Sequence, residues 1–230
     1  MGHTNSRLWY EMKLVFYHGG WLPLVILPVA VLWLQLTTSL SIGTPERAGK
    51  VLEVLLPLVA ALSSAPLMNM ESQAGFAELR ASYAEPWWRL PLDRSLVAAL
   101  WTLLALGLGG LALLAVGGSL RIGSVLPALS PTLFLLGVSL LAGNLTQNYW
   151  AAMGASMGIW FINLAAHTIL VKNVITASLF LFAYTWPPEI VAYSVNRRLL
   201  VGIGVCWFVL NSSWYWWTQK RGLRLYGSTA

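Results

Sequence analysis

Charged side chains are scarce in this chain. Aspartate, glutamate, lysine and arginine make up 10% of its 230 residues, whereas about 25% is usual in soluble domains. Hydrophobic residues make up 57%, and a soluble fold of this size has no interior large enough to bury them. The composition therefore excludes an ordinary soluble domain and predicts an integral membrane protein.

The sequence also lacks the motifs of several enzyme classes. Its single cysteine, Cys206, excludes an intrachain disulfide and a cysteine metal cluster. No GxxxxGK[ST] loop is present, so we expect this chain to bind no nucleotide or other cofactor itself. The three histidines are isolated in the sequence, and we therefore predict neither a metal site nor a catalytic residue.

One string resembles a catalytic motif. Residues 154–158 match GxSxG, but a nucleophile elbow needs a turn from strand to helix, and this string lies inside an apolar run. Ser156 and His167 are eleven residues apart, which places them about 16 Å apart along a helix. We interpret the string as small residues that pack helices together, and His167 as a packing donor rather than a proton relay.

Apolar runs of about 20 residues, the length that crosses a bilayer, recur along the chain. They predict a single all-α transmembrane domain over residues 1–230, with six spans and an amphipathic interfacial helix at 6–18. Polar turns are expected at 43–50 and 143–148. The predicted spans are 21–40, 51–70, 95–116, 125–142, 150–170 and 199–217.

Two carboxylates lie close to span ends. Glu53 is predicted to be an interfacial carboxylate that reaches the membrane surface or a loop cation, with a ligand role as the alternative. Asp93 is predicted to cap the third span. With these residues assigned to the interface, we expect a tryptophan-rich bundle without buried charge pairs in its spans.

Residues 71–94 form the one substantial polar segment between spans, with seven of the 22 charged residues. Glu71 and Glu78 recur on one face of a predicted helix, and Phe76 and Leu79 belong to a different stripe. This pattern indicates a helix outside the membrane.

Lys172 and Asn173 precede an apolar stretch that ends in Pro187, Pro188 and Glu189. The stretch is short for a crossing, so we predict a re-entrant or interfacial hairpin over 172–189. Six spans place both termini on one side, and the distribution of basic residues favours the cytoplasm for that side. A crossing by 173–186 would make seven spans.

Basic residues exceed acidic ones by 14 to 8, which gives a formal net charge of +6. They are spread over short loops and the termini. Anionic lipid headgroups are therefore the expected counterpart, and we expect no nucleic-acid partner.

The order of these parts resembles the permease of type-2 ABC exporters over nearly the whole chain. Its most specific portion is Glu71-Ser72-Gln73-Ala74-Gly75-Phe76-Ala77-Glu78-Leu79-Arg80, followed by Leu90-Pro91-Leu92-Asp93-Arg94-Ser95. Gly143-Asn144 and Pro187-Pro188 are similar to the family's cytoplasmic turn and extracellular break. The sequence departs from the family in an insert at 81–88.

The resemblance implies that 71–94 is a cytoplasmic coupling segment that docks on a separate ABC ATPase subunit, which binds ATP and magnesium. It also implies a second permease, identical or homologous, and a multi-pass protein of a bacterial cell membrane. The family's substrates include drugs, peptides, lipids and polysaccharides. The expected absence of buried charge pairs from the spans favours an amphipathic or hydrophobic molecule such as a peptide antibiotic, a drug or a lipid. The coupling residues carried over are Glu71, Gly75, Phe76, Glu78, Leu79 and Arg80.

Two other hypotheses stay open at this point. A non-transporting immunity or sensor partner would have the same composition. An intramembrane enzyme would need acid, base or metal-binding residues that converge at membrane depth, and the sequence offers few of them.

Overall fold

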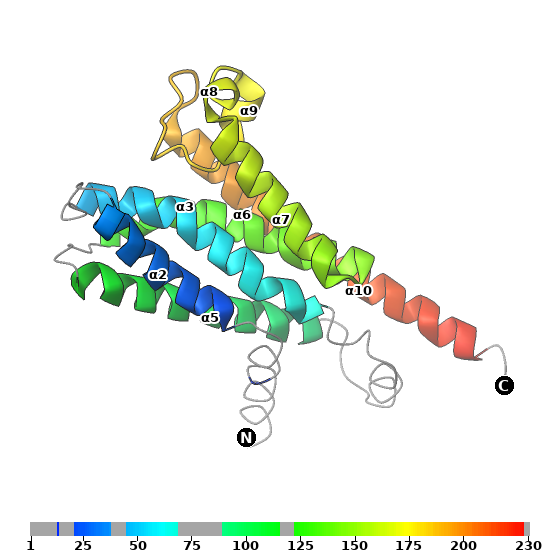
Figure 1. Ribbon diagram of the computed structural model, residues 1–230. Helices are drawn as coiled ribbons and strands as arrows, with labels where there is room; N and C mark the ends of the chain where they lie inside the picture. Colours follow the sequence, from blue (N-terminus) through cyan, green and yellow to red (C-terminus); the bar gives the residue numbers. More distant parts are fainter. Residues whose placement is uncertain (1–12, 14–20, 38–44, 69–88, 116–121, 228–230) are drawn as a thin grey trace.

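The computed structural model describes residues 13, 21–37, 45–68, 89–115 and 122–227, and within these ranges the protein is all-helical (Figure 1). The elements, in chain order, are α2 (Leu22–Thr37), α3 (Pro45–Ser64), η2 (Ala65–Met68), α5 (Arg89–Ala115), α6 (Ile122–Thr146), α7 (Tyr149–Ala165), α8 (His167–Leu170), α9 (Val174–Ser178) and α10 (Tyr193–Gly227).

Four of these helices are long and apolar enough to cross a membrane. They contain the segments Glu46–Leu67, Leu92–Ala115, Val125–Thr146 and Tyr193–Trp214. The described part of α2 has 16 residues and α7 has 17, which is short for a bilayer of about 30 Å. The all-helical fold and its membrane-spanning character are thus supported, and six crossings stay a prediction.

Helix α6 lies at the centre of the bundle and packs against α3, α7 and α10. On one side α2, α3 and α5 form a layer of their own (Figure 1). Their shared core is aliphatic, with Leu27, Leu52, Leu56, Ala105 and Leu113 all fully buried. This arrangement makes α3 and α10 neighbours of the same central helix.

Glycine allows α6 and α10 to approach closely. A Cβ atom placed on Gly137 would lie 2.8 Å from the Trp207 Cβ, and one placed on Gly204 would lie 3.2 Å from the Leu133 carbonyl carbon and oxygen. Both distances are shorter than ordinary van der Waals contact. Each glycine therefore lets a residue of the facing helix, Trp207 or Leu133, approach its backbone closely, as is common between membrane helices.

Several helix ends differ from the sequence-based predictions. Residues 45–50, predicted as a turn, form the first part of α3. Asp93 is not a cap, because α5 already begins at Arg89 and the last residues of the predicted segment 71–94 belong to it. Helix α6 continues to Thr146, so that the turn before α7 is shorter than predicted. In each case the helix extends beyond the apolar run from which it was predicted.

The close approach of α6 and α10 predicts the effect of two glycine substitutions. Gly137→Ala should lower the midpoint of heat-induced aggregation in detergent, because overpacking costs about 1–3 kcal/mol. Gly202→Ala is the matched control, since a Cβ there meets nothing within 4 Å. It should leave the midpoint unchanged or raise it, given the higher helix propensity of alanine. Equal midpoints for the two variants would contradict the predicted contact.

Candidate functional site

The chain between α7 and α10 does not form one continuous helix. It consists of the short helices α8 and α9, followed by residues 179–192, which contain no helix and which we call the strap (Figure 1). Helix α9 already ends at Ser178, and Pro187 and Pro188, which have no backbone N–H, disfavour a helix further along the strap. Irregular backbone in a membrane protein needs partners for its N–H and C=O groups, and the neighbouring helices provide them.

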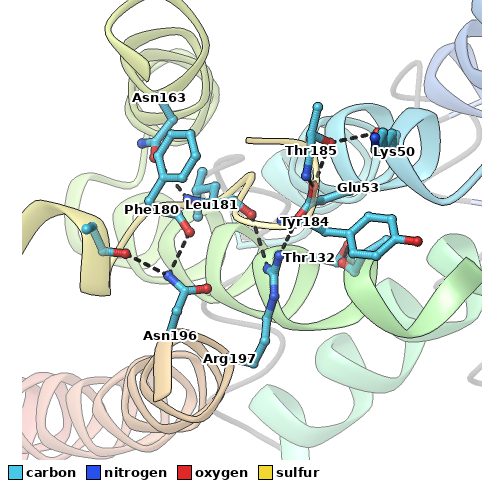
Figure 2. Close-up of polar contacts among 12 residues, drawn as sticks. Lys50, Glu53, Thr132, Asn163, Phe180, Leu181, Tyr184, Thr185, Asn196 and Arg197 are labelled. Atoms are coloured by element: carbon cyan, nitrogen blue, oxygen red, sulfur yellow. Dashed lines mark hydrogen bonds and ion pairs between the residues drawn. The ribbon is translucent and has the colours of Figure 1, made fainter. Parts of the chain in front are cut away.

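Glu53 of α3 is the main acceptor for the strap. Its side chain is fully buried, and it accepts hydrogen bonds from the backbone N–H groups of Tyr184 and Thr185 at 2.9 and 2.7 Å. The Thr185 hydroxyl donates a third bond at 2.7 Å. Figure 2 shows this carboxylate beneath the strap. A single side chain thus satisfies two consecutive backbone donors.

Arg197, in the first turn of α10, neutralises that carboxylate. Its Nη2 forms an ion pair with Glu53 Oε1, and its Nη1 donates to the Leu181 carbonyl of the strap at 3.1 Å. The guanidinium also lies over the Tyr193 ring, 4.7 Å from its centroid, in a cation–π arrangement. The ion pair therefore links α3 to α10 and holds the strap at the same time.

Two asparagines hold the start of the strap. Asn196 is fully buried and its Nδ2 lies 3.1, 3.0 and 2.9 Å from the carbonyl oxygens of Ala177, Ser178 and Phe180. Asn163 of α7 accepts a bond from the Leu181 N–H at 3.0 Å. These side chains, together with Glu53 and Arg197, form a group that we call the polar latch (Figure 2).

The strap also carries its own apolar contacts. Residues 180–183 are fully buried, and Phe182 makes edge-on contacts with Trp160 and Trp186 at centroid distances of 6.2 and 6.1 Å. The Trp160 indole N–H donates to the Val54 carbonyl at 2.7 Å. The strap is therefore packed into the bundle rather than lying on its surface.

His167 packs against the strap, whereas the GxSxG string lies inside α7 without close contacts at its glycines. The His167 ring stacks on Trp186 at 4.6 Å, with Nδ1 3.1 Å from the Leu164 carbonyl oxygen. Ser156 lies inside α7 and donates to the Ala152 carbonyl at 2.8 Å. The contacts of His167 agree with its predicted packing role. The prediction for the GxSxG string is wrong, because the Ser156 bond stays within α7 and a Cβ atom on Gly154 or Gly158 would meet nothing within 4 Å.

The opposite end of the bundle has a different polar contact. Asn144 of α6 donates to the Asn211 side chain of α10 at 2.8 Å, and both residues are buried. Gln147 and Asn148 form the tight turn to α7, and Gln147 has a left-handed backbone with φ of 51°. This turn lies within the predicted range 143–148.

The residues predicted for the hairpin at 172–189 take different positions. Lys172, Pro187 and Glu189 are exposed, whereas Pro188 is buried. Because Asn163 near the end of α7 and Asn196 at the start of α10 both hold the strap, the segment begins and ends at the same end of the bundle. The predicted coupling residues at 71–80 lie outside the described residues.

One expectation from the sequence is confirmed in part and another is wrong. Glu53 does reach a cation that the predicted spans placed in a loop, Arg197, but its side chain is buried in the bundle rather than exposed. The bundle does contain a buried charge pair, since the Arg197 side chain is only 11% exposed. Two sequence features could have indicated this pair. Glu53 lies inside an apolar run, and the basic residues Arg197 and Arg198 come just before the last apolar run of the chain.

The latch has the chemistry of a structural connector. Its carboxylate is already engaged by three hydrogen bonds and an arginine. Among the residues that the structure describes, no three histidine, cysteine, aspartate or glutamate side chains gather in a way that could hold a metal ion. The arrangement satisfies and positions the strap backbone.

No family model, curated protein or solved structure matches this chain.

Removing the latch carboxylate should destabilise the protein. Glu53→Gln leaves the Arg197 guanidinium buried without its counter-charge, and breaking such a pair costs about 3–5 kcal/mol. Glu46→Gln is the control on the same helix, because Glu46 forms an exposed pair with Lys50 at 3.0 Å and such pairs contribute about 0–1 kcal/mol. Heat-induced aggregation in detergent should begin at a clearly lower temperature for Glu53→Gln but not for Glu46→Gln. Indistinguishable aggregation curves for the two variants would refute the role assigned to the Glu53–Arg197 pair.

The strap geometry predicts the sidedness of two exposed positions. In a Cys206→Ala background, cysteines at Lys172 and Glu189 should both react with a membrane-impermeant maleimide added from the same side of sealed vesicles. Their exposure in the structure makes both thiols accessible. Labelling of the two cysteines from opposite sides would show that the segment crosses the membrane.

Proposed function

We propose that this chain is the transmembrane subunit of an ATP-driven ABC exporter. With a second permease, identical or homologous, it forms the path for an amphipathic or hydrophobic substrate such as a peptide antibiotic, a drug or a lipid. Separate ATPase subunits bind ATP and magnesium and supply the energy. Both termini and the segment 69–88 then lie in the cytoplasm, and the strap lies at the outer side as a re-entrant segment.

The observation that carries the proposal is the placement of the broken segment in the order of helices. The strap follows α7, precedes the last long helix and returns to the end of the bundle from which it started. The sequence resemblance places a re-entrant element at this position in type-2 ABC permeases.

Helix α3 supports the proposal by its position. It carries Glu53 close to the strap, and through η2 it leads to the segment 69–88 that contains the predicted coupling residues. Glu53 and Leu67 are separated by fourteen residues, about 21 Å along a helix. One element thus joins the strap to the segment on which an ATPase would dock.

The polar latch also favours a transporter over an intramembrane enzyme. Its buried carboxylate is engaged by backbone donors and Arg197 rather than facing a nucleophile or a metal ligand. A non-transporting immunity or sensor partner would require no ATPase. Affinity purification from native membranes followed by mass spectrometry separates these possibilities, because an exporter subunit retains an ATPase that carries a nucleotide-binding loop.

The coupling residues give the sharpest test of this function. Phe76→Ala and Leu79→Ala should each release the ATPase from the purified complex, because buried apolar anchors at interfaces contribute about 2 kcal/mol or more. Glu78→Ala should retain most of the ATPase, since a charged residue at the rim of an interface contributes less binding free energy than a buried apolar one. The measurement is the amount of ATPase that copurifies with each variant and its ATP hydrolysis in nanodiscs.

Full retention and full hydrolysis in both apolar variants would remove the support for a coupling role. The same result is expected if 71–94 is a solvated loop that only connects two spans.

A further inference from the structure

We propose that the strap is a releasable element, which the polar latch holds against α3 and α10 in the described state and which detaches when α3 moves relative to α10. Release during the ATP cycle rests on the proposed exporter function, whereas release on loss of the latch does not.

The latch connects two helices that share a central neighbour. Helices α3 and α10 both pack on α6, and the Glu53–Arg197 pair connects them directly. The bonds from Glu53 to the strap are 2.7–2.9 Å long, and hydrogen bonds are lost beyond about 3.5 Å. A shift of about 1 Å between α3 and the strap therefore breaks these three bonds together.

The bonds of the latch depend on one another. When Glu53 moves away, two strap N–H groups and the Arg197 guanidinium lose their acceptor at once. Buried polar groups without partners are costly, so partial release is less stable than either complete state. Such a group switches between two arrangements instead of deforming gradually.

Helix α3 contains a point of reduced stiffness at the latch. Pro57 lies inside α3, four residues after Glu53. Proline has no backbone N–H, so the Glu53 carbonyl loses the helical hydrogen bond that residue 57 would otherwise donate. Bending at such a site is common in helices, and here it displaces the residue that holds the strap.

The strap has a natural reporter position. Ala183 is fully buried next to Tyr184, whose backbone N–H donates to Glu53, and its replacement by cysteine adds one sulfur atom. The chain has one native cysteine, so Cys206→Ala provides a cysteine-free background. Ala60→Cys, at a fully buried position near the C-terminal end of α3, reports general unfolding.

The first experiment uses the full chain in lipid nanodiscs and an impermeant maleimide. Glu53→Gln should increase the labelling rate at Ala183→Cys at least tenfold. Thr185→Val, which removes one hydroxyl donor, should increase it less, and Glu46→Gln should not change it. Labelling at Ala60→Cys should stay slow in all of them.

Two results would overturn the proposal. Equal rates at Ala183→Cys with and without Glu53→Gln would show that the latch does not hold the strap. Parallel increases at Ala183→Cys and Ala60→Cys would show that the whole bundle loosens. Thr185→Val keeps the ion pair, so the comparison stands even if Glu53→Gln fails to fold.

The second experiment uses the chain purified with its ATPase. Labelling at Ala183→Cys should rise severalfold during ATP hydrolysis or after trapping with vanadate, and Pro57→Ala should reduce that rise while the latch stays intact. Labelling that does not depend on nucleotide, in a complex that hydrolyses ATP, would overturn release during the cycle. Absence of a copurifying ATPase would instead overturn the exporter function and leave the first experiment as the test of the latch.

Discussion

The buried ion pair between Glu53 and Arg197 is the interaction on which the strap and its surroundings depend. A non-helical segment packed among apolar helices must find partners for its backbone groups. A carboxylate can accept several bonds at once, and Glu53 takes two N–H groups and a hydroxyl from the strap. Its charge is tolerable in the interior because Arg197 neutralises it and also binds a strap carbonyl.

The two ends of the α6–α10 contact are held by different chemistry. One end has a neutral amide pair, Asn144 and Asn211, and the middle has close backbone packing at Gly137 and Gly204. At the other end, α10 contributes Arg197 to a charge pair with α3. Neutral and steric contacts fix the distance between α6 and α10, whereas the charge pair determines where the strap can lie.

The sequence allowed prediction of the helical fold, because long apolar runs have few alternatives in a chain of this composition. The sequence did not locate helix ends such as Arg89. Apolar runs indicate only the apolar part of a helix, and these helices continue into polar residues. The role of Glu53 was missed for another reason: its partner Arg197 is 144 residues away, and only tertiary packing brings them together. Pro187 and Pro188 indicated a non-helical segment because proline acts locally, although α9 ends nine residues earlier, at Ser178.

The separation of Glu53 and Arg197 along the chain also bears on biosynthesis. Domains form progressively from the N-terminus as the ribosome elongates the chain, so α3 enters the bilayer long before α10 is made. During that interval the Glu53 carboxylate lacks its cationic partner, and the strap backbone lacks its ordered acceptor. This end of the bundle consequently reaches its final arrangement only after the last helix has been inserted, and a nascent chain that stops before residue 197 has no arginine there to neutralise the Glu53 carboxylate.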